Sequence, residues 1–193
     1  MKITTKNYQY GLYIGEYMFS TYSIMDILRI SKQAPKEIIK NGILPENSIL
    51  LLSGQPKARK SFLVFNLALA IAAGKSFACF EIPKPKRVLL LSAEGGDYSN
   101  SQRLGKMYEH IHGIGDLNKS LENNLSISFL PKLWINDTSD RRKLMDKIEE
   151  INPDVLILDP LIRFHDADEN SAKEMSEVFS CLRTFIACRG PAY

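Results

Sequence analysis

The hydrophobic pattern of the chain alternates between short continuous apolar runs and longer segments with helical spacing. The continuous runs cover residues 49–52, 87–92 and 154–159. Runs of this length, bounded by turn residues, are typical of strands that are buried on both faces. Helical spacing, capping residues or Ala/Leu content mark residues 62–73, 98–112, 138–150 and 171–188. The alternation predicts an α/β fold in which a mostly parallel sheet carries helices on both faces.

Weaker patterns predict the remaining organisation. In residues 125–130 apolar side chains alternate with serine, which suits a strand near the edge of the sheet. Ser23, with Asp26 three residues on, caps a short helix over 23–30. We therefore divide the chain into an N-terminal arm with a short helix (1–33) and one core domain (34–193). Residues 35–48, with an Asn-Gly turn, are interpreted as a connector to the first core strand.

A turn with phosphate-binding residues follows the first apolar run. Its members are Gly54, Gln55, Pro56, Lys57, Ala58, Arg59, Lys60, Ser61 and Phe62. In a strand, turn and helix of this kind, backbone N–H groups and the positive end of the helix bind a polyphosphate. A lysine reaches the β- and γ-phosphates and a hydroxyl holds Mg²⁺, so these roles fall to Lys60 and Ser61.

Arg59 occupies the position where the usual pattern G-x-x-x-x-G-K-[ST] has its second glycine. Glycine there lets the backbone approach phosphate without a Cβ, so an arginine requires a different path of the loop. Its cation could contact phosphate or a neighbouring subunit. The alternative interpretation is a solvated cluster of Lys57, Arg59 and Lys60 on a surface turn. The apolar run before the turn and the helix after it favour nucleotide binding.

Two carboxylates follow the other apolar runs. Asp159 ends the third run, as expected of a Walker B aspartate that orders Mg²⁺ through Ser61 or water. Glu94 follows the second run, and the carboxyl ends of parallel strands face the crevice where ligands of such sheets bind. Glu94 is therefore a candidate general base for an attacking water. The alternative is a loop carboxylate that caps the next helix.

The segment after Asp159 is expected to form a polar, mobile loop. In this loop Arg163 and His165 are candidates to sense the γ-phosphate or to reach across a subunit boundary. Both residues are equally compatible with a plain surface position.

Composition narrows the class of protein only slightly. With 193 residues, 45% hydrophobic and 24% charged, the chain suits a globular domain, and a net charge of +3 does not require nucleic acid. Its three cysteines show no metal-ligand spacing, which is typical of reduced thiols. The apolar run at 62–73 is too short to cross a bilayer. We therefore expect a cytoplasmic protein that does not enter a membrane.

The ordered motifs resemble the RecA-like ATPase group that includes hexameric plasmid replicative helicases of the RepA type, often described as AAA-25 domains. The resemblance covers residues 34–190 and rests on segments 42–54, 54–61, 87–96 and 158–165, followed by Asp-Glu-Asn at 168–170. It implies ATP hydrolysis in a homo-oligomeric ring, with Lys60 and Ser61 on phosphate and Mg²⁺. It further implies that Glu94 activates water, that Asp159 supports the metal, and that single-stranded or duplex DNA is a partner.

The resemblance also leaves alternatives open. Proteins of this group continue with another core strand, a sensor residue and arginine-finger elements, so we expect a core that is truncated at its C-terminal end. Together with Arg59, this allows a regulatory or assembly module that binds ATP with little or no hydrolysis. A small-molecule kinase is a weaker third interpretation, because no acceptor-binding residues are recognisable.

Overall fold

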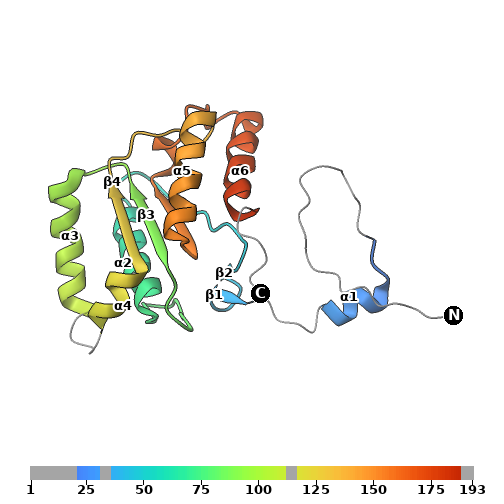
Figure 1. Cartoon of the computed structure of the whole chain (residues 1–193), viewed down its shortest axis with the longest axis horizontal. Coiled ribbons are helices and arrows are strands. Elements are labelled where there is room, and N and C mark those ends of the chain that lie inside the picture. The colour runs from blue at the N-terminus through green and yellow to red at the C-terminus, as the bar shows by residue number, and fades with distance from the viewer. Residues whose placement is uncertain (1–20, 31–35, 112–116, 188–193) are drawn as a thin grey trace.

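The computed structural model of the chain describes residues 21–30, 36–111 and 117–187 (Figure 1). Most of the N-terminal arm lies outside these residues, so the division at residue 33 stays a prediction. None of the described helices is long and apolar enough to span a membrane. In chain order the elements are α1 (Ile24–Ile30), β1 (Glu37–Ile39), β2 (Leu44–Pro45), α2 (Lys60–Ala73), β3 (Val88–Ser92), α3 (Gly96–Ile111), α4 (Leu117–Asn124), β4 (Leu125–Phe129), α5 (Thr138–Ile151), β5 (Val155–Asp159), the 3₁₀ turn η2 (Leu161–Arg163) and α6 (Ala172–Ala187).

The central sheet has the strand order β4-β3-β5, and both pairings are parallel. Strand β4 lies at the edge, as its alternation with serine predicts. In the register of the sheet, Ser92 at the end of β3 is opposite Asp159 at the end of β5. The residues that follow these two strands therefore lie side by side at one edge of the sheet. The parallel strands with helices between them confirm the α/β fold class.

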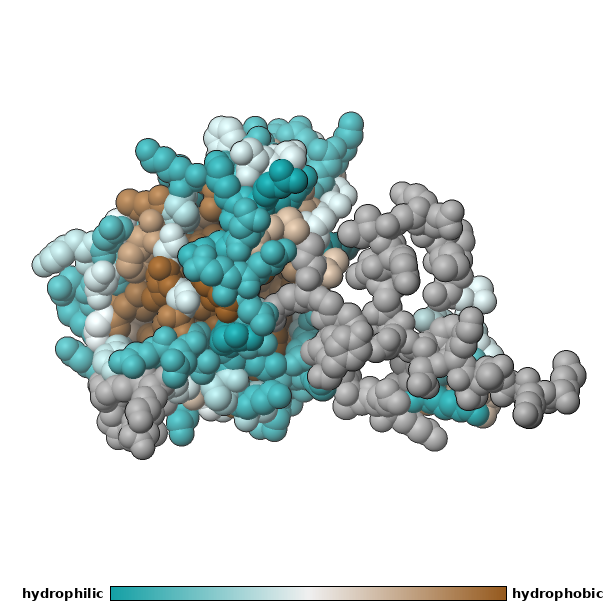
Figure 2. All heavy atoms as spheres, viewed as in Figure 1, coloured by the Kyte–Doolittle hydropathy of each residue, from teal (hydrophilic) through white to brown (hydrophobic). Residues whose placement is uncertain are grey.

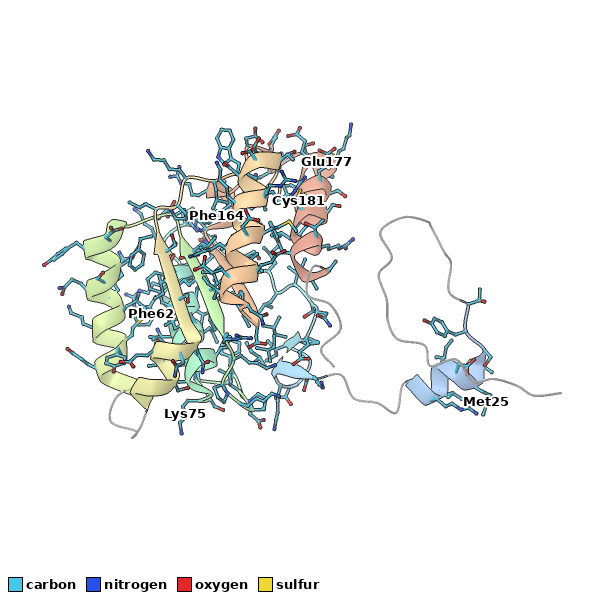
Figure 3. All side chains as sticks on the ribbon, viewed as in Figure 1. Met25, Phe62, Lys75, Phe164, Glu177 and Cys181 are labelled. Atoms are coloured by element: carbon cyan, nitrogen blue, oxygen red, sulfur yellow. The ribbon has the colours of Figure 1, made fainter. Side chains whose placement is uncertain are left out.

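The two faces of the sheet are covered by different helices. Val88 and Leu90 are completely buried in a cluster that includes α2 and residues of α3 and α4. Leu89 and Leu91 point to the other face, where they belong to a cluster with residues of α5 and α6. Phe164, buried in the second cluster, is labelled in Figure 3. Helices on both faces explain why β3 is apolar at every position except its last.

Helix ends follow the expected capping chemistry. Ser23 Oγ accepts from the Asp26 N–H at 3.2 Å, which confirms the cap of α1. Gly74 ends α2 in the left-handed region, with φ 66° and ψ 34°. A Cβ on Gly74 would also lie 2.4 Å from the Pro85 nitrogen, so both conformation and space require glycine here. Ser171 Oγ accepts from the Glu174 N–H at 3.3 Å, as predicted for the start of α6.

The first predicted strand, at residues 49–52, is not a strand in this structure. The segment is extended but pairs with no described strand, and Ile49, Leu50 and Leu51 are 41%, 37% and 55% exposed. The same segment and β5 line a cavity of about 900 Å³, together with residues of α2 and α6. Among the described residues, β5 has no strand partner on the side away from β3, and its residues line this cavity instead. The expectation that β5 is fully buried is wrong for the same reason, since four of its five residues are only partly buried.

The strands β1 and β2 and the helix α4 were not predicted from the pattern. The connector holds a short antiparallel pair of β1 and β2, and Asn41 and Gly42 adopt positive φ between them. An Asn-Gly pair is a hairpin signal, but strands of three and two residues give almost no periodicity. Helix α4 precedes β4, and its Ser120 donates a 3.1 Å hydrogen bond to the Ala72 carbonyl of α2.

Figure 2 shows apolar side chains between α3 and α5, where the helices leave part of this face of the sheet visible. A second cavity, of about 660 Å³, lies between this face and α5. Leu89 and Leu91 of β3 and Leu144 of α5 contribute apolar lining, while Ser126 and Ser128 of β4 contribute hydroxyls. The serines that mark β4 as an edge strand therefore face a partly open groove.

Candidate nucleotide-binding site

The predicted phosphate loop connects the extended segment to the first turn of α2. The loop contains a turn in which the Ala58 N–H donates to the Gln55 carbonyl at 3.2 Å. Lys57 and Arg59 both have positive φ, at 64° and 58°. All residues from Gly54 to Arg59 are exposed, as is Phe62. The loop is therefore an open turn at the N-terminus of a buried helix, where backbone N–H groups lack intrahelical partners.

Arg59 shows how the loop accommodates the missing second glycine. It is the N-cap of α2 in the left-handed conformation (φ 58°, ψ 31°), and its side chain makes no capping hydrogen bond. This conformation costs a non-glycine residue roughly 1–2 kcal/mol. Arg59 thus adopts a backbone conformation that favours glycine, and the prediction that the arginine changes the path of the loop stays a prediction. The exposed side chain remains available to solvent or a ligand.

Lys60 folds back over the loop. Its ammonium donates to the carbonyl oxygens of Gly54 and Gln55, at 2.6 and 3.0 Å. A Cβ on Gly54 would lie 3.8 Å from Lys60 Cδ and 4.0 Å from Ala58 Cβ, which are ordinary van der Waals distances. The structure therefore has room for a side-chain carbon at Gly54, and the contact that involves this residue in the loop is its carbonyl, which accepts from the Lys60 ammonium.

Ser61 joins the phosphate loop to the carboxylate strand. Its hydroxyl donates to Asp159 Oδ1 at 3.2 Å, although the two residues are 98 positions apart. Asp159 is 7% exposed, and burial raises the pKa of its carboxyl above the ordinary value, with the Glu94 charge acting in the same direction. The Ser61 hydrogen bond and the Lys60 ammonium lower this pKa in part. Lys60, Ser61, Glu94 and Asp159 therefore form one electrostatically coupled group.

Glu94 is placed by a fixed backbone but has an exposed side chain. The amide of Asn100, a residue only 1% exposed, donates to the Glu94 carbonyl at 2.6 Å and to Ser92 Oγ at 3.3 Å. Gly95 follows with φ 87°, and a Cβ there would lie 2.7 Å from Asn100 Oδ1. Asn100 was not identified from the sequence. Its only signal is a polar residue on the first turns of the helix that follows the carboxylate.

The two candidates after β5 have different surroundings. Arg163 is 62% exposed at its side chain, and its Nε donates to Glu94 Oε1 at 3.2 Å. His165 is 5% exposed, and neither of its ring nitrogens has a hydrogen-bond partner among the described residues. The expectation of a polar loop is therefore wrong for His165 and its neighbour Phe164, which is fully buried. Phe164 anchors this segment in the apolar cluster beneath α5 and α6.

The donor set suits Mg²⁺ bound together with a nucleotide. Magnesium prefers oxygen ligands and is usually held by one or two protein side chains plus phosphates and water. The Ser61 hydroxyl and the Asp159 carboxylate are oxygen donors in mutual contact. No group of three or more His, Cys, Asp or Glu side chains in the described part of the chain forms a metal site by itself. The residues present therefore fit a metal that arrives with phosphate oxygens.

A parallel α/β sheet, a Lys-Ser loop at the start of a buried helix and an adjacent strand-end aspartate define a RecA-like P-loop fold. A family model described as an AAA domain matches residues 16–191. The chain therefore belongs to the AAA domain family, which indicates a nucleotide-binding ATPase. No curated protein matches the sequence.

Proposed function

We propose that this chain binds Mg·ATP and hydrolyses it to ADP and phosphate. The hydrogen bond between Ser61 and Asp159 is the observation that carries the proposal, because it brings the loop and the carboxylate strand into one site. Such a site is what binding a triphosphate and its metal requires. Lys60 lies in the same loop and is the cation that we assign to the β- and γ-phosphates.

In this proposal the loop and Asp159 divide the binding of the phosphates and of Mg²⁺ between them. The Lys60 ammonium exchanges two neutral carbonyl acceptors, on Gly54 and Gln55, for phosphate oxygens, which are stronger charge-assisted acceptors. Backbone N–H groups at the start of α2 bind the phosphates, and residues 55–59 with Phe62 surround them. Ser61 and Asp159 hold Mg²⁺, which when bound supplies charge neutralisation at the transferred phosphoryl group.

Glu94 is the proposed general base. Its carboxylate accepts a proton from a water molecule as the water oxygen bonds to the γ-phosphorus and the bond from phosphorus to the ADP oxygen breaks. ATP and water thus yield ADP and inorganic phosphate. The Glu94 side chain is 53% exposed and meets solvent water readily, whereas Asp159 is only 7% exposed and contacts the Ser61 hydroxyl. This difference supports giving the proton transfer to Glu94 and the metal to Asp159.

The biological setting we propose is a helicase-like or DNA replication or repair motor in the cytoplasm. The proposal rests on the resemblance of the motifs to ring-forming replicative helicases, and it includes a homo-oligomer, hexameric in that group, with DNA as a partner. Measuring ATPase activity with and without single-stranded DNA tests it. Stimulation by DNA is the expected result, and equal rates would contradict a DNA motor.

The test of the site compares three variants of the full chain. Glu94→Gln should keep nucleotide affinity and lose about 10²–10⁴ in turnover, the usual contribution of a general base. Lys60→Ala should lose nucleotide binding itself. Arg142→Ala on the exposed face of α5 is the control and should behave as the wild type. Unchanged turnover in Glu94→Gln would remove Glu94 from the mechanism.

The alternative, an ATP-binding module with little hydrolysis, is favoured by two observations on the loop side. Arg59 holds a strained left-handed conformation, and Lys60 is already bonded to the loop carbonyls. Equilibrium binding and a hydrolysis assay on the same preparation separate the two functions. Tight binding of ATP without turnover would favour the module.

A further inference from the structure

We infer that Arg163 is a positioning residue that holds the Glu94 carboxylate in place. The inference rests on the proposed ATPase function and deepens it, because it gives a second residue a task at the proposed base. Arg163 Nε donates to Glu94 Oε1 at 3.2 Å, and the two residues are 69 positions apart. Within the described residues this is the only hydrogen bond of either side-chain head group.

The backbones on both sides of this pair are fixed. Glu94 follows β3, and the buried Asn100 amide holds its carbonyl at 2.6 Å. Arg163 ends η2, where its N–H donates to the Pro160 carbonyl at 3.1 Å, and the fully buried Phe164 follows it directly. Since β3 and β5 are paired in register, the backbone of Glu94 after β3 and that of Arg163 after β5 lie at a fixed distance from each other. The arginine therefore approaches the carboxylate from a rigid neighbour.

In contrast to the backbones, the side chains of Glu94 and Arg163 are held by no other described hydrogen bond than the one between them. Glu94 and Arg163 are 53% and 62% exposed. A glutamate head group with this exposure samples several rotamers unless a partner selects one. The contact through Nε engages one carboxylate oxygen, so Oε2 remains available to accept from water. Arg163 thus restrains the proposed base without occupying it.

Because the ion pair between Arg163 and Glu94 is exposed, its loss should affect kcat without affecting the stability of the fold. Exposed ion pairs contribute little to folding, because water and salt screen them. Arg163→Ala should therefore leave the unfolding midpoint unchanged. It should lower kcat by about three- to fivefold, because an exposed ion pair can bias the population of carboxylate rotamers by no more than that. Nucleotide affinity should change less than twofold, and Arg163→Lys should recover part of the lost kcat.

The decisive experiment is a double-mutant cycle on the full chain. In a Glu94→Gln background, where the base is already lost, Arg163→Ala should lower kcat by less than twofold further. A full, additive loss in that background would overturn the inference, and so would a kcat loss matched by an equal loss of affinity. Arg142→Ala removes the same charge from exposed α5 and should leave kcat within twofold of wild type.

NMR spectroscopy tests the contact between Arg163 and Glu94 independently of turnover. In ¹⁵N-arginine-labelled, nucleotide-free chain, the Nε–H resonance of Arg163 is assigned by its loss in Arg163→Lys. Glu94→Ala removes the acceptor and should shift this resonance, while the other arginine resonances stay in place. An unshifted resonance would overturn the inference even if the chain proves to be an ATPase. If Glu94→Gln keeps full turnover while the resonance still shifts, the contact exists but Glu94 is not the base, and the inference is overturned. If the wild-type chain shows no ATPase activity while the resonance still shifts, the proposed function fails and the contact stands.

Discussion

Two segments of this chain have almost the same sequence and different structures. Residues 49–53 read Ile-Leu-Leu-Leu-Ser, and residues 88–92 read Val-Leu-Leu-Leu-Ser. The second segment is β3, buried at all five positions between two paired strands. The first has no strand partner among the described residues and exposes three of its leucine and isoleucine side chains. Apolar content favours a strand, but neighbouring backbone and covering helices decide whether one forms and is buried.

The comparison also divides the candidate site into two sides. Asp159 ends β5 and Glu94 lies two residues after the end of β3, and these two strands are paired in register, so the relative position of the two backbones is well determined. The phosphate loop follows the unpaired segment and is exposed from Gly54 to Arg59. One hydrogen bond, from Ser61 to Asp159, connects the two sides. The carboxylate side of the candidate site therefore rests on paired strands, whereas the phosphate loop follows a segment without a described strand partner.

The largest expected effect comes from truncating matched leucines in the two segments. Leu90 of β3 is completely buried, so Leu90→Ala should lower the free energy of unfolding by about 2–5 kcal/mol. Leu50 is 37% exposed, so Leu50→Ala should cost less than about 1 kcal/mol. Urea denaturation followed by circular dichroism measures both. Equal losses would mean that residues 49–52 are buried in solution, as the sequence pattern predicts.

The same contrast separates the features that the sequence predicts from those that it does not. The parallel sheet, its helices and the candidate residues at the strand ends followed from apolar runs and turn chemistry, which act locally. The unpaired segment at 49–52 and the half-buried β5 did not, because pairing depends on distant backbone. Asn100 and the pairing of Arg163 with Glu94 were missed for a similar reason. They depend on contacts across the fold that no local spacing encodes.

A smaller effect concerns the buried side of the site, where Asp159, the proposed metal ligand, carries a cost in stability. Burial raises the pKa of its carboxyl, so the charged form is disfavoured in the folded protein at neutral pH. Asp159→Asn keeps the shape and an acceptor for Ser61, and should raise the free energy of unfolding by about 1 kcal/mol without nucleotide. Thermal denaturation at pH 7 measures the gain. Magnesium-dependent nucleotide affinity should fall in the same variant.

The pH dependence of this gain fixes its origin. An acid with a raised pKa binds its proton more tightly in the folded state, so wild-type stability falls as pH rises through the interval between the unfolded and folded pKa values. The difference between Asp159→Asn and wild type should therefore vanish below the ordinary aspartate pKa and reach its full size above the raised one. Denaturation curves from pH 3 to pH 8 test this. A gain that is constant with pH would assign the effect to packing instead of charge.

The smallest expected effect lies on the exposed side, at Arg59. Its left-handed conformation costs an L residue roughly 1–2 kcal/mol, whereas glycine adopts it without strain but loses about 0.4–1 kcal/mol through a more flexible unfolded chain. Arg59→Gly should therefore be more stable than Arg59→Ala by about 1 kcal/mol or less, since both remove the side chain and only the first relieves the strain. Paired urea denaturation curves measure the difference. If the alanine variant is the more stable one, the loop does not keep this conformation in solution, and the phosphate-binding shape forms only when a ligand imposes it.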